Sequence, residues 1–404
     1  MPTEARNPAR LVYLDWIRVA AFALLILYHV GMFYVTWDWH VKSDHASHAL
    51  EPLMLLANPW RLTLLFLVSG AATRFMADKM GPATLAGRRT LRLLIPLVFA
   101  IVVIVPPQSY YEVVEAIGYQ GSYPAFWARY LAADPGFCDA DGCLDVPTWN
   151  HLWFVAYLLV YTLLLALALG VARGPLLRFG AFLGRHLSGA GLLAWPILFL
   201  AAARLVLMPM FEITHALVDD WYNHAVSLAA FLFGFLLMKD RMVAAECIRM
   251  RRFALTAFLA AYAAYAAYAW AWRAGDAVPP EALRMVMRLV YAIDQWTAIV
   301  AVLGYGALHL NRDGPLLRTL TEAVFPFYIL HQTIIVVAGH HLKSLGLPAP
   351  AEGIVLIAIT VGGCWLGYDL VRRVGVLRPL FGLGRRAPAV RTIHPAIDRV
   401  PAAD

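Results

Sequence analysis

The chain has 404 residues, of which 61% are hydrophobic and only 15% are charged, and its mean hydropathy is +0.65. Soluble domains contain about 45–50% apolar and about 25% charged residues, so this composition excludes an ordinary soluble protein. The formal net charge of +7 comes from basic residues grouped between apolar stretches. That grouping is a topology signal, so we expect membrane lipids and no nucleic acid as partners.

About ten apolar stretches are long enough to cross a bilayer. We therefore expect an all-α polytopic integral membrane protein, a bundle of about ten transmembrane helices. The approximate limits of the predicted spans are 12–34, 53–75, 93–113, 150–171, 189–210, 223–241, 254–273, 286–309, 321–341 and 353–373.

Arginine and lysine are concentrated in the segments that share one side with the N-terminus. An even number of spans then places both termini in the cytoplasm of a bacterial inner membrane. A polar, Arg/Pro-rich segment over residues 381–404 is predicted to be a disordered cytoplasmic tail. The few basic residues on the opposite, outer side are Lys42, Arg129, Arg273, Arg284, Arg288 and Lys343.

The first span carries Asp15, Arg18 and His29 within apolar sequence. At about 100° per residue the three side chains share one stripe of a helix, with Arg18 and His29 about 16 Å apart along its axis. Ionisable groups inside a membrane are costly and usually mark a functional site. The alternative is that Arg18 snorkels to the interface beside Asp15, while His29 only bonds a neighbouring helix.

The second span places Arg61 in its outer half and Ser69 and Gly70 in its inner half. The small side chains of Ser69 and Gly70 would allow a helix or a ligand to approach closely. Arg74 ends the span at the inner face. The basic segment 88–92 that follows fits anionic lipid headgroups or a phosphate-rich cytoplasmic ligand.

Between Pro106 and Asn150 we expect a long outer loop rich in aromatic residues. These residues fit an interfacial aromatic belt, and sugar-binding faces are the alternative. Cys138 and Cys143 lie in this loop, where an oxidising compartment would permit a disulfide, but the sequence leaves their state open. The cysteine and histidine spacings predict no metal site.

The fourth span begins with His151 and Trp153, which we place at the outer mouth of the bundle. The fifth span carries Arg204 in its middle. The outer segment 215–224 that follows is dense in polar groups, which weakly supports an external polar substrate. Later predicted spans contain Asp294 and the pair His331 and Gln332. Placing such polar groups inside a membrane costs free energy, so we expect them to have a function.

The predicted polar residues therefore form two sets. The set toward the cytoplasm is cationic, and the set toward the outside is rich in imidazole and aromatic groups. Transfer from an anionic cytoplasmic donor to an external acceptor would need such an arrangement, with arginine holding phosphate and histidine taking a proton. A proton-coupled transporter would also use buried Asp, Arg and His. Composition alone does not separate these two functions.

Four sequence motifs carry a resemblance to a known family. The segment LDWIRVAAFALLILYH, with Arg18 and His29, resembles the first-helix signature of the integral-membrane acyltransferase family 3. LFLVSGAATRF resembles the second-helix Ser-Gly motif of that family. HLWFVAYLLVY and FYILHQ resemble its glucan biosynthesis protein C branch, which is associated with succinylating periplasmic glucans.

The resemblance implies a transmembrane acyltransferase domain over residues 1–380. It implies that acetyl-CoA or succinyl-CoA, bound from the cytoplasm, donates an acyl group to a hydroxyl of a glycan or another exported molecule. His29 matches the essential first-helix histidine and Arg18 its paired arginine, and we expect His29 to be the general base. No metal is expected.

From position and motif together we predict three groups of site residues. The predicted catalytic residues are His29, Arg18 and His331. The donor would be bound by Arg18, Ser69, Gly70 and Arg74. The acceptor would be bound by Arg61, His151, Trp153, Asp294 and Gln332. A transporter or flippase of a polar or lipid-linked substrate is the alternative function, and a homodimer is among the assemblies that the sequence leaves open.

Overall fold

The computed structural model describes residues 11–139, 142–275 and 277–384, and within these ranges the chain forms helices and no named strand. Short one-turn segments η1 (His48–Leu50) and η3 (Asn150–Leu152) and a π-helical turn η2 (Ala100–Ile104) join the longer elements. The helices are α1 (Val12–Met32), α2 (Glu51–Leu55), α3 (Arg61–Ala77), α4 (Pro82–Phe99), α5 (Pro106–Ile117), α6 (Tyr123–Leu131), α7 (Trp153–His186), α8 (Gly191–Val206), α9 (Trp221–Leu237), α10 (Arg241–Ala271), α11 (Glu281–His309), α12 (Pro315–Lys343), α13 (Ala349–Arg373) and α14 (Leu377–Leu380).

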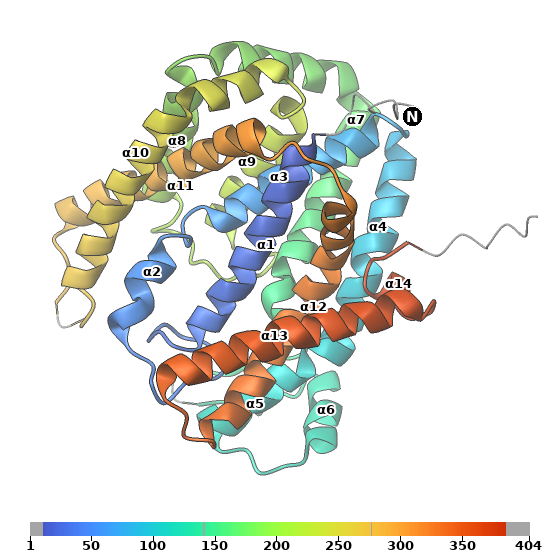
Figure 1. Cartoon of the computed structure of the whole chain (residues 1–404), viewed down its shortest axis with the longest axis vertical. Helices are drawn as coiled ribbons and strands as arrows, with labels where there is room; N and C mark the ends of the chain where they lie inside the picture. The colour runs from blue at the N-terminus through green and yellow to red at the C-terminus, as the bar shows by residue number, and fades with distance from the viewer. Residues whose placement is uncertain (1–10, 140–141, 276, 385–404) are drawn as a thin grey trace, which may run out of the picture.

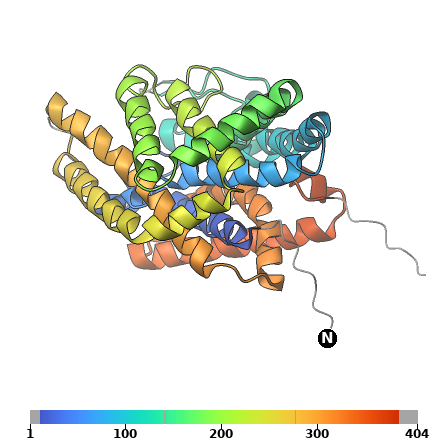
Figure 2. The same cartoon turned by 90° about the horizontal axis from the view of Figure 1, so that it is seen from above.

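Helix α1 occupies the middle of the bundle (Figures 1 and 2). It contacts α3, α11, α12 and α13, whereas α10 and α11 pack mainly on each other along their length. Its apolar residues pack from several sides, with Ile17 and Leu25 almost completely buried. One side of α1 is therefore held inside the protein, whereas Leu27 on another side is 48% exposed.

Seven segments are long and apolar enough to cross a membrane: α1, α4 to α5, η3 to α7, α10, α11, α12 and α13. Every predicted span contains a helix, but α3, α8 and α9 are shorter, with 17, 16 and 17 residues. The helical fold and the membrane-spanning character are confirmed, whereas the count of about ten spans is not. Short helices inside a bundle cover less of its thickness and leave room for polar residues at their ends.

The predicted long loop after Pro106 is wrong in part, because the segment forms helices α5 and α6. Trp127 is 37% exposed, but most of the aromatic residues of the segment turn inward. They pack into a small core that includes Phe126, Tyr130 and Phe137, with Tyr110 against it. This burial supplies the apolar contacts that allow the segment to fold, and Cys138 and Cys143 form a disulfide beside it.

Helices α3 and α9 cross at two glycines. A Cβ atom added to Gly70 would overlap the carbonyl group of Phe231, and one added to Gly234 would overlap that of Leu67. Backbones approach this closely only where side chains are absent. The crossing therefore fixes where the two ends of α3, and the arginines that they carry, lie in the bundle.

Lys42 holds the loop that follows α1. Its Nζ donates to the carbonyl oxygens of Met32 at 2.8 Å and Val35 at 3.0 Å, and also to that of Trp37. These carbonyls would otherwise lack partners beyond the end of the helix. The loop is thus tied back over the C-terminal end of α1.

Ordered packing continues to the end of the described residues. Phe381 stacks edge-on against Phe99 with ring centroids 5.5 Å apart, and Leu383 is buried. The predicted tail, 381–404, thus begins with residues that pack on α4. Its remainder, 385–404, lies outside the described residues.

Candidate active site

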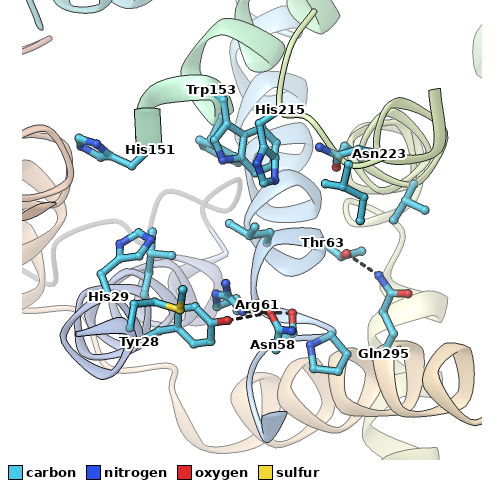
Figure 3. A pocket seen from close by; sticks show the side chains of 18 of the residues that line it. Tyr28, His29, Asn58, Arg61, Thr63, His151, Trp153, His215, Asn223 and Gln295 are labelled. Atoms are coloured by element: carbon cyan, nitrogen blue, oxygen red, sulfur yellow. Dashed lines mark hydrogen bonds between the residues drawn. The ribbon is translucent and has the colours of Figure 1, made fainter. Parts of the chain in front are cut away.

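A polar pocket of about 460 Å³ opens where α1, α3, α8, α9 and α11 meet the start of α7 (Figure 3). It lies at the end of the bundle that carries the C-terminus of α1 and the loop before α9. The walls combine imidazole, guanidinium, amide and aromatic groups from segments far apart in the sequence. The polar and aromatic residues that line it include Tyr28, His29, Asn58, Arg61, Thr63, His151, Trp153, Arg204, His215, Tyr222, Asn223, Tyr291 and Gln295.

His29 is held by a hydrogen-bonded chain that begins on α12. The Nδ1 atom of His331 lies 2.7 Å from the carbonyl oxygen of Tyr328 and 3.2 Å from that of Phe327. Carbonyl oxygens only accept, so this nitrogen must carry a proton and donate it. In a neutral ring the other nitrogen, Nε2, is then an acceptor.

The Nε2 atom of His331 lies 2.7 Å from Nδ1 of His29. His29 must therefore donate from Nδ1, which leaves its own Nε2 with a lone pair. Nε2 of His29 has no hydrogen-bond partner among the described residues, and the ring lines the pocket. A charged His331 would be completely buried with no carboxylate against it, which favours the neutral ring.

His151 completes the imidazole cluster from the start of α7. Its Nε2 lies 3.0 Å from the carbonyl oxygen of Tyr328, so it donates to the same oxygen as His331. Its ring meets that of His331 edge-on, with centroids 5.0 Å apart. The hydroxyl of Tyr328 in turn donates to the carbonyl oxygen of His151. One peptide oxygen on α12 thus orients two histidine rings.

Gln332 lies in a network behind this cluster. Its Nε2 lies 2.8 Å from Nε2 of His40 and 3.1 Å from Oε1 of Gln108. The other nitrogen of His40 lies 2.7 Å from the Glu112 carboxylate, and Asn150 donates to Gln108 at 3.0 Å. These bonds join α12 and α5 to the loop after α1 and the turn before α7. The network supports the segment that carries His151.

The loop before α9 covers the pocket with His215. Its ring stacks on Trp153 with centroids 4.3 Å apart, and its carbonyl oxygen accepts from Nε1 of Trp149 at 3.1 Å. Burial lowers the pKa of His215; Asp220 opposes this shift and Arg61 adds to it. His215 is therefore a neutral ring that shapes the pocket at neutral pH.

Arg61, at the start of α3, is 6% exposed and has no carboxylate partner among the described residues. Its guanidinium carbon lies 3.3 Å from the ring centroid of Tyr28. Nη1 donates to the side-chain oxygen of Asn58 at 2.8 Å and to its carbonyl oxygen at 3.1 Å. Nε lacks a partner.

Arg204, on α8, repeats this arrangement in the same pocket. It is 8% exposed, and its guanidinium carbon lies 3.3 Å from the ring centroid of Tyr291 on α11. Nη1 donates to the hydroxyl of Tyr222 on α9 at 2.9 Å, and Nε lacks a partner. As with Arg61, no carboxylate in the described ranges pairs with it.

The opposite end of α1 and α3 holds a second group of arginines that have acidic neighbours. Arg18 lies 3.5 Å from Asp15. Arg74 donates to Asp78 at 3.1 Å, and Lys239 reaches the same carboxylate at 2.6 Å. These charges are therefore largely balanced within the protein.

Arg89 on α4 differs from these neighbours. It is 8% exposed and donates to the Thr73 hydroxyl at 3.3 Å. The charged groups that influence it electrostatically are those of Arg92 and Arg18, and both are positive. This end of the bundle therefore has an excess of positive charge around Arg89.

The structure brings together four of the predicted site residues, His29, Arg61, His151 and Trp153, as lining of one pocket. His331 stands directly behind His29, and Gln332 lies in the supporting network. Asp294 is buried with both carboxylate oxygens unpartnered among the described residues, yet it does not line the pocket. The roles predicted for these residues stay predictions.

The predicted donor residues lie together near the other end of α3. Gly70 packs against α9, and the carbonyl oxygen of Ser69 accepts from Thr73 at 2.8 Å. Arg18 and Arg74 lie near acidic residues, as described above. A donor-binding role for these residues remains a prediction, and Arg89 joins them by position.

Arg204, Tyr222 and Tyr291 line the pocket but were not among the site residues predicted from the sequence. A charged residue inside the apolar segment 189–210 was the available signal for Arg204, the same signal that drew attention to Arg61. The tyrosines carried no comparable signal, because aromatic residues are common in membrane helices. Their role depends on which helices face each other.

The described residues contain no group of three or more His, Cys, Asp or Glu side chains that could hold a metal ion. Residues 11–369 match a family model described as an acyltransferase domain. No curated protein and no solved structure matches the chain.

Proposed function

Because this chain belongs to the acyltransferase family whose domain model matches residues 11–369, we propose that it acylates hydroxyl groups of exported molecules. The family and the apolar helices make it a membrane acyltransferase. The proposal adds the substrates and the base. An acyl group, acetyl or succinyl, would pass from cytoplasmic acyl-CoA to a hydroxyl of a glycan or another exported acceptor, with His29 as general base.

The hydrogen-bonded chain from Tyr328 through His331 to His29 is the observation that carries this proposal. It leaves a lone pair on Nε2 of His29, which lines the pocket and has no hydrogen-bond partner at this nitrogen among the described residues. A hydroxyl is a poor nucleophile until a base removes its proton, and imidazole suits this task near neutral pH.

The proposed reaction proceeds as follows. Nε2 of His29 takes the hydroxyl proton while the oxygen attacks the thioester carbonyl carbon. The new C–O bond forms, the C–S bond breaks, and the proton passes to the departing thiolate to give free CoA thiol. His331, held by the carbonyl oxygen of Tyr328, keeps the ring of His29 in the reactive orientation throughout.

The arginine group at the opposite end would receive the phosphates of the donor. Arg89 has two basic neighbours, Arg92 and Arg18, and no acidic partner among the described residues. Guanidinium groups suit phosphate oxygens in both charge and geometry. A long donor held there could extend its thioester along α1 toward His29, since about eleven residues of helix cover about 16 Å.

The one-sided distribution of basic residues supports a cytoplasmic location for this arginine group. The Cys138–Cys143 disulfide lies near the end of the molecule that carries the pocket, and disulfides persist in oxidising compartments. Both features support a pocket that faces the outside of a bacterial inner membrane. The motif resemblance favours a glucan as acceptor.

Acceptor-dependent release of CoA thiol tests the proposal. Membranes with the wild-type chain would receive acetyl-CoA or succinyl-CoA and a linear β-glucan, and the free thiol and the acylated glucan would be quantified. We expect release with at least one donor, and a loss of about 10²–10⁴-fold in His29→Gln. Near-normal turnover in His29→Gln would refute the role of His29, and acylation without His29 and His331 would refute the mechanism.

A further inference from the structure

Arg61 and Arg204 are unusual in the pocket because each is more than nine-tenths buried with no carboxylate partner in the part of the chain that the structure describes. They come from different helices: Arg61 is the first residue of α3, and Arg204 lies in the last turn of α8. Both arginines line the same pocket, together with Tyr291, whose ring is stacked on Arg204. Asp38 also lines the pocket, but it is exposed and pairs with neither arginine.

The protein only partly offsets the cost of burying these charges. Burial of an unpaired ion is costly, whereas a cation–π contact contributes about 0.5–2 kcal/mol. Tyr28 covers one face of Arg61, and Tyr291 covers one face of Arg204. Both Nε atoms remain without a partner. The guanidinium groups are thus held in place but retain donors for a further acceptor.

We propose that Arg61 and Arg204 form a binding site for an anionic group, a carboxylate or a phosphate, on a substrate that occupies the pocket with His29. Guanidinium donors match the oxygen geometry of both groups. Stacking on tyrosine and hydrogen bonds to Asn58 and Tyr222 orient the donors before the ligand arrives. This inference rests on the proposed function for the identity of the substrates.

Two substrates could carry the anion. One is the acyl donor, if the far end of its acyl chain carries a free carboxylate. The other is the acceptor, if it carries a phosphate or an acid group near the reacting hydroxyl. Both sources share the same chemistry at the site, so the experiment must separate them.

Ligand binding, rather than turnover, provides the test. The full chain in detergent would be titrated with two matched pairs of probes, each with a charged and a neutral member. Monomethyl succinate and dimethyl succinate represent an acyl chain with and without its distal carboxylate. Glucose 6-phosphate and glucose represent an acceptor with and without a phosphate. Isothermal titration calorimetry would give the dissociation constants.

We expect the wild-type chain to bind the charged member of at least one pair about tenfold or more tightly. Preference within the succinate pair assigns the site to the donor, and preference within the glucose pair assigns it to the acceptor. Arg204→Gln and Arg61→Gln should each weaken binding of that charged probe by about 10- to 100-fold and leave the neutral probe unchanged. Arg249→Gln, at an exposed ion pair with Glu246, should change neither and serves as the control.

Equal binding of charged and neutral probes by the wild-type chain would overturn the proposal, and this result needs no variant to fold. If the variants with glutamine are unstable, Arg204→Lys and Arg61→Lys replace them in the test. These variants keep the charge but lose the planar guanidinium, so we expect them to retain only part of the preference for the charged probe. An unchanged preference in folded Arg61→Gln and Arg204→Gln would also overturn it. Failure of CoA release with intact anion binding would instead count against the proposed function alone.

Discussion

The two ends of the bundle hold arginine in different ways. At one end Arg18 and Arg74 lie beside Asp15 and Asp78, so protein carboxylates offset most of their charge. At the pocket end Arg61 and Arg204 lie on tyrosine faces without a carboxylate. The difference teaches that arginines with similar sequence signals can have acidic neighbours at one end of the bundle and only tyrosine faces and neutral hydrogen-bond partners at the other.

The largest effect should come from the imidazole pair of the pocket end. Replacing His331 by Leu removes the acceptor for Nδ1 of His29 and frees that ring to rotate. We expect turnover to fall by about 10²-fold with little change in acceptor KM, because a positioning residue acts on the base and not on binding. His331→Asn, whose side-chain oxygen can accept the same hydrogen bond, should recover part of the rate.

Initial rates against acceptor concentration and pH separate this role from a structural one. A shift in the pH profile of His331→Leu, with an unchanged profile shape in His331→Asn, is the expected pattern. Equal rates in both variants and the wild type would show that His331 does not orient His29.

At the opposite end, the comparison predicts that Arg89 matters more than Arg74 for the donor. Arg89 lacks an acidic partner in the described part of the chain, whereas Arg74 is bonded to Asp78. We expect Arg89→Gln to weaken acyl-CoA binding by about 10-fold or more and Arg74→Gln by less than about 3-fold. Equilibrium binding of labelled acyl-CoA measures both. A larger loss in Arg74→Gln would reverse this assignment.

The glycine crossing of α3 and α9 sets the relative position of the two ends. In Gly234→Ala the new methyl group would meet the backbone of Leu67, so the helices must separate. We expect a loss of about 1–3 kcal/mol in the free energy of unfolding. Thermal unfolding in detergent gives the comparison with Gly87→Ala, whose added Cβ meets nothing within 4 Å and which should be neutral or slightly stabilising. Equal melting temperatures would show that the crossing tolerates a side chain.

The smallest expected effect concerns Lys42, which is held by carbonyl oxygens at the pocket end. Burial lowers the pKa of Lys42 from 10.5 to about 8, against the opposing influence of Asp38 and Glu51. The unfolded chain therefore binds more protons between about pH 8 and about pH 10.5, and stability gains a positive contribution as the pH rises through this range.

Since Lys42 is only partly buried, solvent screening reduces this contribution to about 1–2 kcal/mol. The difference in unfolding free energy between the wild type and Lys42→Met, followed from pH 7 to pH 10.5, isolates it from other titrating groups. We expect the unfolding free energy of the wild type to increase relative to that of Lys42→Met as the pH rises. A constant difference would contradict the lowered pKa.

Much of the candidate site was accessible from the sequence because its signals are local. Arg18, Arg61 and His29 stand out as ionisable residues within apolar segments, and four predicted residues line one pocket. The sequence did not distinguish Gln332 and Asp294, which are buried elsewhere, from residues that reach the cavity. It also gave no reason to join Arg204 to Tyr291, because that contact depends on how α8 and α11 face each other.

The sequence by itself determined that the protein is helical, embedded in a membrane and marked by an Arg18–His29 stripe, because hydropathy and helical periodicity are properties of neighbouring residues. The tertiary structure decided which polar groups meet. His29 and His331 are 302 positions apart, and their hydrogen bond depends on the rotation and height of α12 against α1. Helix packing sets these quantities, as at the Gly70–Gly234 crossing, and no single segment contains them.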